Sequence, residues 1–377
     1  MFLTIIFAAI VASACGILPV DADPEGEPAI PTPTPTSSTA DSTEPNETER
    51  EGSGPTASGK SGETDPSVSQ AQADGFCPGL TATNSGSIES AALTEVSGVV
   101  TASDGQSLWV HNDSGDRPVL YRVGFDGADL GEFVLASGTT ILGRDIEDIA
   151  RDTQHLYLGD IGDNSNHHPY IQIIRVAEPS LTPPDEVTSA PSPPKTEIES
   201  YQLVDLFYPD HPQDAEALIV DPATGSIIVV TKDPTSQRVY IADAPIAWGG
   251  EQELRLLADI SPLSTSGETD TTEGTTLLDQ FQQFSALLNA ATGADLRADG
   301  AALALRTYGE VRIFPLDPSQ PIDQAIVAAL SQPEQSCVAP TPLELQGEAV
   351  AFLDATSLQV VTIAEGLHSP INGARTD

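Results

Sequence analysis

The chain has 377 residues and a formal net charge of −41, from 56 acidic and 15 basic side chains. This acidic balance argues against nucleic acids, anionic membrane surfaces and free polyanions as partners. It fits a strongly solvated surface or the binding of cations.

The N-terminus carries an export pattern. The first fourteen residues are almost entirely apolar and small, and residues 12–15 read Ala-Ser-Ala-Cys. This pattern resembles the site at which bacterial lipoproteins are cleaved and diacylated. The resemblance implies a signal peptide over 1–14 and a lipidated Cys15 that anchors the exported chain to the outer face of the bacterial cell membrane, its only contact with a membrane. Residues 2–4 lack the usual Lys or Arg, and a signal cut without lipidation is the alternative.

A tether and one folded domain are expected after the signal. Residues 15–76 are acidic and rich in Pro, Ser, Thr and Gly, so they cannot bury a core and we expect them to be disordered. Residues 77–377 then form a single domain. Its two cysteines, Cys77 and Cys337, lie just inside its ends and are expected to form a disulfide. In the chain-entropy model that bond would contribute about 5 kcal/mol; two separate buried thiols are the alternative.

A repeat dominates the domain. An acidic residue, a small residue and an apolar run recur five times, each followed by a turn and a second strand. The motif acids are Glu95, Glu147, Glu216, Asp295 and Glu348. Repeated antiparallel units of three or four strands predict an all-β fold with a single β-propeller. Five blades are favoured, with a sixth over residues 251–278 as the alternative count; a plain β-sandwich would not explain the repeat.

Two further features concern how the ring is completed. The last unit has only two clear strands, so we expect N-terminal residues after Cys77, including 87–93, to supply its outer strands. Apolar residues at helical spacing predict two short helical insertions, within 277–288 and 322–330.

The repeat also predicts a site. In each antiparallel pair the second strand returns to the face where the motif acid lies, so its polar end should meet the acids around the axis. Like charges at close range need raised pKa values or a cation, and oxygen ligands favour Ca²⁺. The predicted metal ligands are Glu95, Glu147, Asp148, Asp160, Asn164, Glu216, Asp295 and Glu348. The alternative is that each acid accepts backbone N–H groups of the next blade and locks the ring, most strongly for Glu95 and Glu348.

A family resemblance supports this prediction. Residues 108–116, 147–150, 156–164, 214–218 and 346–349 resemble a family of secreted bacterial β-propeller lipoproteins, loosely similar to phytase-like and gluconolactonase-like calcium propellers. The resemblance covers roughly residues 95–366 and implies calcium at the axial face. It implies no catalytic residues, because the basic phosphate pocket of phytases is not evident.

Two functions remain open. In the first, the axial face of a monomer binds a small molecule, glycan or protein without catalysis. In the second, the protein is a calcium-dependent phosphoester or lactone hydrolase. His111 or Glu147 would then be the base, and Lys232 or Arg306 would stabilise the anion. Binding is favoured, because a propeller fold alone implies no reaction.

Overall fold

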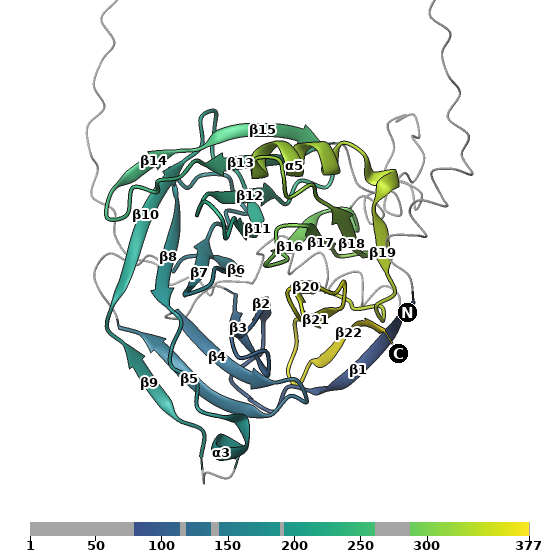
Figure 1. Cartoon of the computed structure of the whole chain (residues 1–377). Coiled ribbons are helices and arrows are strands. Elements are labelled where there is room, and N and C mark those ends of the chain that lie inside the picture. Colours follow the sequence, from purple (N-terminus) through teal and green to yellow (C-terminus); the bar gives the residue numbers. More distant parts are fainter. Residues whose placement is uncertain (1–78, 114–117, 137–142, 189–191, 261–286, 377) are drawn as a thin grey trace, which may run out of the picture. The chain divides into compact units, whose positions relative to one another are not determined.

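Five sheets radiate from a common axis in the computed structural model (Figure 1). The structure describes residues 79–113, 118–136, 143–188, 192–260 and 287–376. The innermost strand of each sheet is, in chain order, β2 (Val96–Thr101), β6 (Ile146–Arg151), β11 (Ala215–Val220), β16 (Ala291–Leu296) or β20 (Gly347–Phe352). Each inner strand contacts the next, and β2 contacts β20. The fold is therefore all-β, a five-bladed propeller, as the favoured count predicted.

The blades are numbered in chain order of their inner strands. Blade 1 continues outward with β3 (Ser107–Asn112), β4 (Val119–Gly124), β5 (Asp129–Leu135) and β9 (Lys195–Ile198). Blade 2 continues with β7 (His155–Asp160), β8 (Ile171–Ala177), β10 (Tyr201–Phe207) and β14 (Glu251–Glu253). Blade 3 continues with β12 (Ile227–Thr231), β13 (Gln237–Ala242) and β15 (Arg255–Ile260). Blade 4 continues with β17 (Ala302–Thr307), β18 (Val311–Pro315) and β19 (Cys337–Ala339).

Blade 5 closes the ring by strand exchange, as predicted. It consists of β20, β21 (Val360–Ala364), β22 (Pro370–Thr376) and the N-terminal β1 (Leu80–Ser87), which pairs with β22. The C-terminus supplies three strands instead of the predicted two, and residues 88–93 lead into β2 instead of forming a strand. The sequence hid β22 because it contains Asn372 and Gly373 and does not alternate. Gly373 packs so closely that a Cβ there would lie 2.2 Å from the carbonyl oxygen of Val360.

The described part of residues 251–278 forms no sixth blade. Its strands β14 and β15 are the outermost strands of blades 2 and 3. β14 pairs with β10 in parallel, as β9 pairs with β5, so both are additions to a four-stranded antiparallel blade. Residues 261–286 lie outside the described residues.

The core lies between neighbouring sheets. Every residue of β2, β11 and β20 is buried. Val, Ile, Leu and Ala side chains of adjacent blades pack into apolar clusters, each large side chain contributing roughly 1.5–3 kcal/mol on burial. The sequences of these strands are mostly apolar, and each has a polar residue at its second position.

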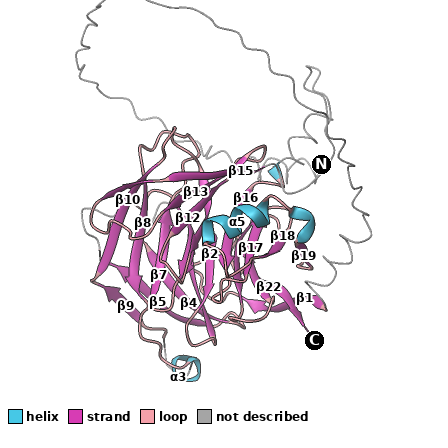
Figure 2. Ribbon diagram, turned by 45° about the horizontal axis from the view of Figure 1, so that its top comes forward, coloured by secondary structure: helices cyan, strands magenta, loops and turns pink. Residues whose placement is uncertain are grey.

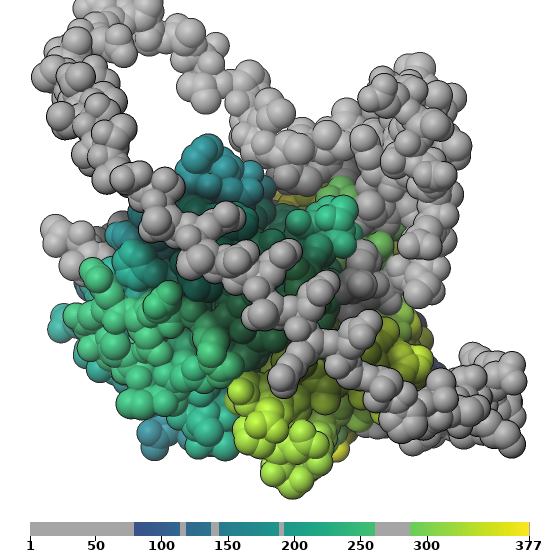
Figure 3. Space-filling view, turned by 90° about the horizontal axis from the view of Figure 1, so that it is seen from above, coloured from purple at the N-terminus to yellow at the C-terminus, as the bar shows by residue number. Residues whose placement is uncertain are grey.

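The described residues contain two α-helices (Figure 2). The predicted helix α5 (Ile322–Leu330) is confirmed; it packs Ala325, Ile326 and Leu330 against the apolar cluster of blades 3 and 4. The surface formed by blade 3 and α5 faces the viewer in Figure 3. Helix α3 (Pro184–Thr188) was not predicted, and a short 3₁₀ turn follows α5 at Pro333–Gln335. Almost all of the helix expected within 277–288 lies outside the described residues.

The predicted signal segment, Cys15, the tether and Cys77 also lie outside the described residues. The pairing of Cys77 with Cys337 therefore stays a prediction. Within the part of the chain that the structure describes, no helix has the length and apolar character that spanning a membrane requires.

Candidate axial site

A β-bulge recurs at the same position in all five inner strands. The pairing of each inner strand with its neighbour shifts by one residue. A bulged residue leaves the hydrogen-bond ladder and its side chain is redirected. The bulged residues are Ser97, Glu147, Glu216, Thr292 and Glu348, and all five are buried. The five bulges bring polar side chains to one end of the propeller axis.

Three of the five predicted axial acids occupy these bulges: Glu147, Glu216 and Glu348. Glu95 lies two residues before the bulge of blade 1 and is exposed at the rim. Asp295 lies three residues after the bulge of blade 4, toward the other end of the axis. The predicted repeat was therefore out of register in blades 1 and 4, because it was aligned on acidic residues alone.

Hydroxyl groups take the place of carboxylates in blades 1 and 4. The Ser97 hydroxyl donates to the backbone carbonyl of Glu147, and the Thr292 hydroxyl donates to that of Gly347 at 2.9 Å. Each therefore ties its blade to the next. Allowing a hydroxyl residue in place of the acid would have placed the positions of blades 1 and 4 at Ser97 and Thr292.

The three glutamates, Glu147, Glu216 and Glu348, are buried and form what we call the axial cluster. Burial, reinforced by the charge of Glu216, raises the pKa values of Glu147 and Glu348 well above their usual range. Burial raises the pKa of Glu216 to about 8, against the lowering effect of Lys232. Each pKa is thus raised first by the loss of water and then by neighbouring acids.

Lys232, just after β12, brings a cation into this cluster. Its ammonium forms an ion pair with Glu216 and lies 5.6 Å from the centre of the Tyr308 ring. The Tyr308 hydroxyl donates to Oε1 of Glu348 at 3.4 Å. One lysine cannot neutralise three carboxylates.

A second group of acids adjoins the bulge of blade 2. Carboxylate oxygens of Asp113, Asp145 and Glu147 all lie within 4.8 Å of one another. Because Ca²⁺ binds oxygen at 2.3–2.6 Å, ligands on opposite sides of one ion are separated by about 5 Å. These three oxygens could therefore bind the same ion. Asp113 and Asp145 were not among the predicted ligands, although Asp113 belongs to the polar strand end at 111–116.

A glycine allows this close approach. A Cβ at Gly162 would lie 2.2 Å from Oε1 of Glu147 and 2.5 Å from Oδ2 of Asp145. Gly162 follows β7, so the second strand of blade 2 brings its backbone to the acids as the hairpin argument predicted.

In the axial cluster, two carboxylate oxygens are buried without a hydrogen-bond partner. They are Oε2 of Glu216 and Oε2 of Glu348, in side chains of residues only 1% and 3% exposed. An unsatisfied buried carboxylate oxygen is costly unless a cation or a donor meets it.

Asp148 is placed differently from its prediction as a metal ligand. Its Oδ1 accepts the backbone N–H of Ile149 at 2.8 Å, and its Oδ2 accepts those of Leu218 at 2.8 Å and Ala294 at 3.1 Å. One carboxylate therefore joins the inner strands of blades 2, 3 and 4. This is the ring-locking role considered as the alternative.

Asp160 and Asn164 do not join the cluster either. Asp160 is buried, and its Oδ1 accepts the backbone N–H groups of Arg144 at 3.1 Å and Asp145 at 2.9 Å. It therefore positions Asp145, and its Oδ2 lies 3.5 Å from Nε of Arg144. Asn164 is exposed in the loop after β7.

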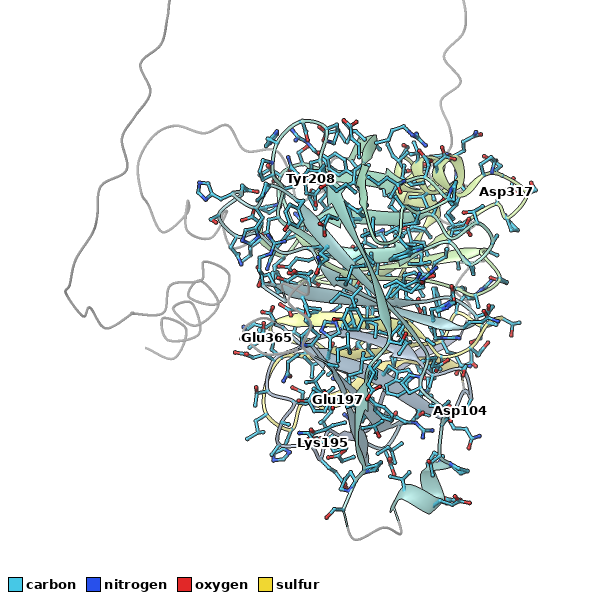
Figure 4. The ribbon with its side chains drawn as sticks, turned by 90° about the vertical axis from the view of Figure 1, so that its left-hand side faces the viewer. Asp104, Lys195, Glu197, Tyr208, Asp317 and Glu365 are labelled. Atoms are coloured by element: carbon cyan, nitrogen blue, oxygen red, sulfur yellow. The ribbon has the colours of Figure 1, made fainter. Side chains whose placement is uncertain are left out.

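Asp295 belongs to the opposite end of the propeller. Its Oδ2 accepts the backbone N–H of Phe352 at 2.7 Å. It lines a pocket of about 320 Å³ with Asp104 and Arg151. Figure 4 shows Asp104 at the edge opposite Glu365. Glu365 belongs to the end of the axial cluster, because its charge helps to raise the pKa of Glu348. Burial raises the pKa of Asp295 to about 7.

The four catalytic candidates fall into two pairs: Glu147 with Lys232, and His111 with Arg306. Glu147 and Lys232 lie in the axial cluster. His111 is 1% exposed, its Nδ1 donates to the carbonyl of Asn112 at 2.8 Å, and burial lowers its pKa to about 4. Arg306 is buried in an ion pair with Glu344. Its guanidinium also donates to the carbonyl of Ala349, so it joins blades 4 and 5.

Comparison with known proteins concerns the fold. No family model matches the chain, and no curated protein matches its sequence. Similar solved structures include the WD40 repeats of RRP9 (8% identity, TM-score 0.37, covering 79% of this chain and 99% of that one). Others are the Cps50 (Swd1) β-propeller domain of Myceliophteria thermophila (10%, 0.37, 78% and 100%) and a luciferin-regenerating enzyme (10%, 0.39, 79% and 96%). The five radial sheets themselves place the chain among the β-propellers.

Proposed function

We propose that Asp113, Asp145 and Glu147, beside the axial cluster, bind a divalent cation, with Ca²⁺ the best fit, and that this end of the propeller binds a ligand or partner. The observation that carries the proposal is the group formed by Asp113, Asp145 and Glu147, whose oxygens lie within 4.8 Å of one another. The unpartnered buried oxygens of Glu216 and Glu348 in the adjoining cluster support it independently.

The donor chemistry favours calcium. The candidate ligand atoms of this group are all carboxylate oxygens, which suit Ca²⁺ better than Zn²⁺ or Cu²⁺. Close, buried carboxylates stay ionised only when a cation offsets their repulsion. Lys232 offsets one charge, and a divalent ion would offset two more.

The test is metal analysis of the dialysed full-length chain, with thermal unfolding in calcium and in chelator. We expect about one calcium ion per chain and a Tm that falls on chelation. At calcium a hundredfold above Kd, the gain in stability is about 2.7 kcal/mol. Asp145→Asn and Glu147→Gln should remove both effects, whereas Glu197→Gln, on the exposed edge strand β9, should keep them. No retained ion and no shift in Tm at millimolar calcium would overturn the proposal.

Hydrolysis is the second candidate function. It is favoured by Lys232 and Tyr308, which put an ammonium and a hydroxyl beside the acids, where they could stabilise an anion. Arg306 is held by Glu344 and Ala349, whereas His111 lines a small pocket together with Asp113. Chromogenic phosphoesters and lactones, assayed with and without chelator, test it: turnover that Glu147→Gln abolishes would establish a hydrolase.

We also propose that the chain is an exported lipoprotein with a Cys77–Cys337 disulfide. Residues 12–15 and the tether support export. The disulfide is supported by β1, which begins three residues after Cys77 and whose Leu80 packs against the same apolar cluster as Cys337. Cys15→Ser should release the chain from membranes in a bacterial host, and a peptide map without reductant should contain the linked cysteines. Membrane retention of the variant, or free thiols at both positions, would contradict these assignments.

A further inference from the structure

Exposed leucines flank the axial site on blade 5. Leu343 is 80% exposed, Leu345 53% and Leu367 57%. Leu343 and Leu345 precede β20, and Leu367 lies in the turn between β21 and β22. Single exposed leucines are ordinary, whereas exposed apolar side chains that lie together mark an interaction surface.

Hydrogen bonds join the two segments that carry these leucines. The backbone N–H of Glu365 donates to the carbonyl of Gln346 at 3.1 Å, and the Gln346 amide donates to Oε2 of Glu365 at 2.7 Å. Leu345 adjoins Gln346, and Leu367 follows Glu365 by two residues. Glu344, between Leu343 and Leu345, is buried against Arg306. Its burial fixes the loop that presents the two leucines on either side of it.

The surroundings of these leucines are acidic. Glu365 is close enough to Glu348, Asp113 and Glu95 for their charges to act on one another. The backbone N–H of Gly366 donates to the carbonyl of Thr94 at 2.9 Å, so the turn of Leu367 adjoins the segment of Glu95. The leucines therefore lie beside a group of acids that we call the acidic rim, formed by Glu95, Asp113, Glu348 and Glu365.

We propose that this leucine patch and the acidic rim together bind a basic peptide segment of another protein, in which Lys or Arg alternates with apolar residues. The proposal rests on the ligand-binding function above and names the class of partner. Charge complementarity identifies the occupant. A second copy of this chain would bring another strongly acidic surface, and an anionic lipid surface would be repelled as well. The apolar residues of such a segment would pack against the leucines, and its Lys or Arg side chains would pair with the carboxylates.

The test is fluorescence anisotropy with the full-length chain and a short labelled peptide of alternating lysine and leucine. A peptide with glutamate in place of lysine and one with serine in place of leucine serve as controls. We expect saturable binding of the first peptide alone, weakened by added salt. The double variant Leu345→Ser/Leu367→Ser should weaken it about tenfold, since it removes apolar area that the peptide buries. Leu256→Ser, at a 44% exposed position on β15, should leave it unchanged.

Calcium binding by the same variants separates this proposal from the previous one. The leucine variants should bind calcium like the native chain, because they touch no carboxylate. Equal peptide binding by the native chain and the double variant would overturn the leucine patch. Equal binding of the glutamate peptide would overturn the role of charge. Sedimentation that shows a native dimer, dissociated by the double variant, would show that a second copy is the occupant.

Discussion

Asp148 in β6 accepts the backbone N–H of Leu218 in β11 at 2.8 Å, which binds one inner strand of the propeller to the next. The same oxygen accepts the N–H of Ala294 in β16. Burial raises the pKa of Asp148, whereas these donors favour its charged form. The ring is thus held by side chain to backbone contacts between inner strands as well as by apolar packing.

Removing this carboxylate should destabilise the protein strongly. Asp148→Ala leaves the buried N–H groups of Leu218 and Ala294 without acceptors, each costing about 1–3 kcal/mol. We expect a loss of roughly 3 kcal/mol or more, measured by urea unfolding. Glu197→Ala, at an exposed position on the edge strand β9, is the control. A loss under about 1 kcal/mol for Asp148→Ala would show that the inner strands do not depend on it.

Gly162 should be required for cation binding. In Gly162→Ala the added Cβ would meet Oε1 of Glu147 at 2.2 Å and push the acids apart. Calcium affinity, measured by calorimetry, should fall at least about tenfold, equivalent to 1.4 kcal/mol. Gly250→Ala, where the Cβ would meet its nearest atom at 3.4 Å, should bind calcium normally. Native affinity in Gly162→Ala would place the ion elsewhere.

Asp295 should make stability depend on pH. Burial raises its pKa from the ordinary value of 3.8 to about 7, so the folded state binds a proton more tightly than the unfolded state. Its contribution to stability is therefore complete below about pH 4 and is lost as the pH rises through 7. Asp295→Asn removes this loss, so its Tm relative to the native chain should rise between pH 5 and pH 8. A difference in Tm that does not change with pH would contradict the raised pKa.

Arg306 should matter for stability and not for the site. Arg306→Met leaves Glu344 buried without its ion-pair partner, which typically costs 3–5 kcal/mol. Urea unfolding should show a loss of about that size, while calorimetry should show unchanged calcium affinity in the folded variant. A large loss of calcium affinity with native stability would return Arg306 to the axial site.

The five blades were predictable because the repeat is regular and the inner strands are almost wholly apolar. Blade 5 was only partly visible, since β22 has no alternating pattern and its pairing with β1 joins the two ends of the chain. Neither feature can be recognised from residues that are neighbours in the sequence.

The placement of the axial acids was predicted in outline and not in detail. A hairpin argument brought Glu147, Glu216 and Glu348 to one end of the axis, together with Lys232. It could not show that a bulge sets the register, so Glu95 and Asp295 were aligned with residues that are not their equivalents. Nor could it tell a carboxylate that accepts backbone N–H groups, such as Asp148, from one that faces the axis.

The most direct test of the cation site is a crystal structure of the full-length chain determined in calcium, with anomalous data. The account predicts a peak within 2.3–2.6 Å of oxygens of Asp113, Asp145 and Glu147. Carboxylates at this end of the axis that contact only protein atoms and water, with no peak among them at saturating calcium, would contradict it.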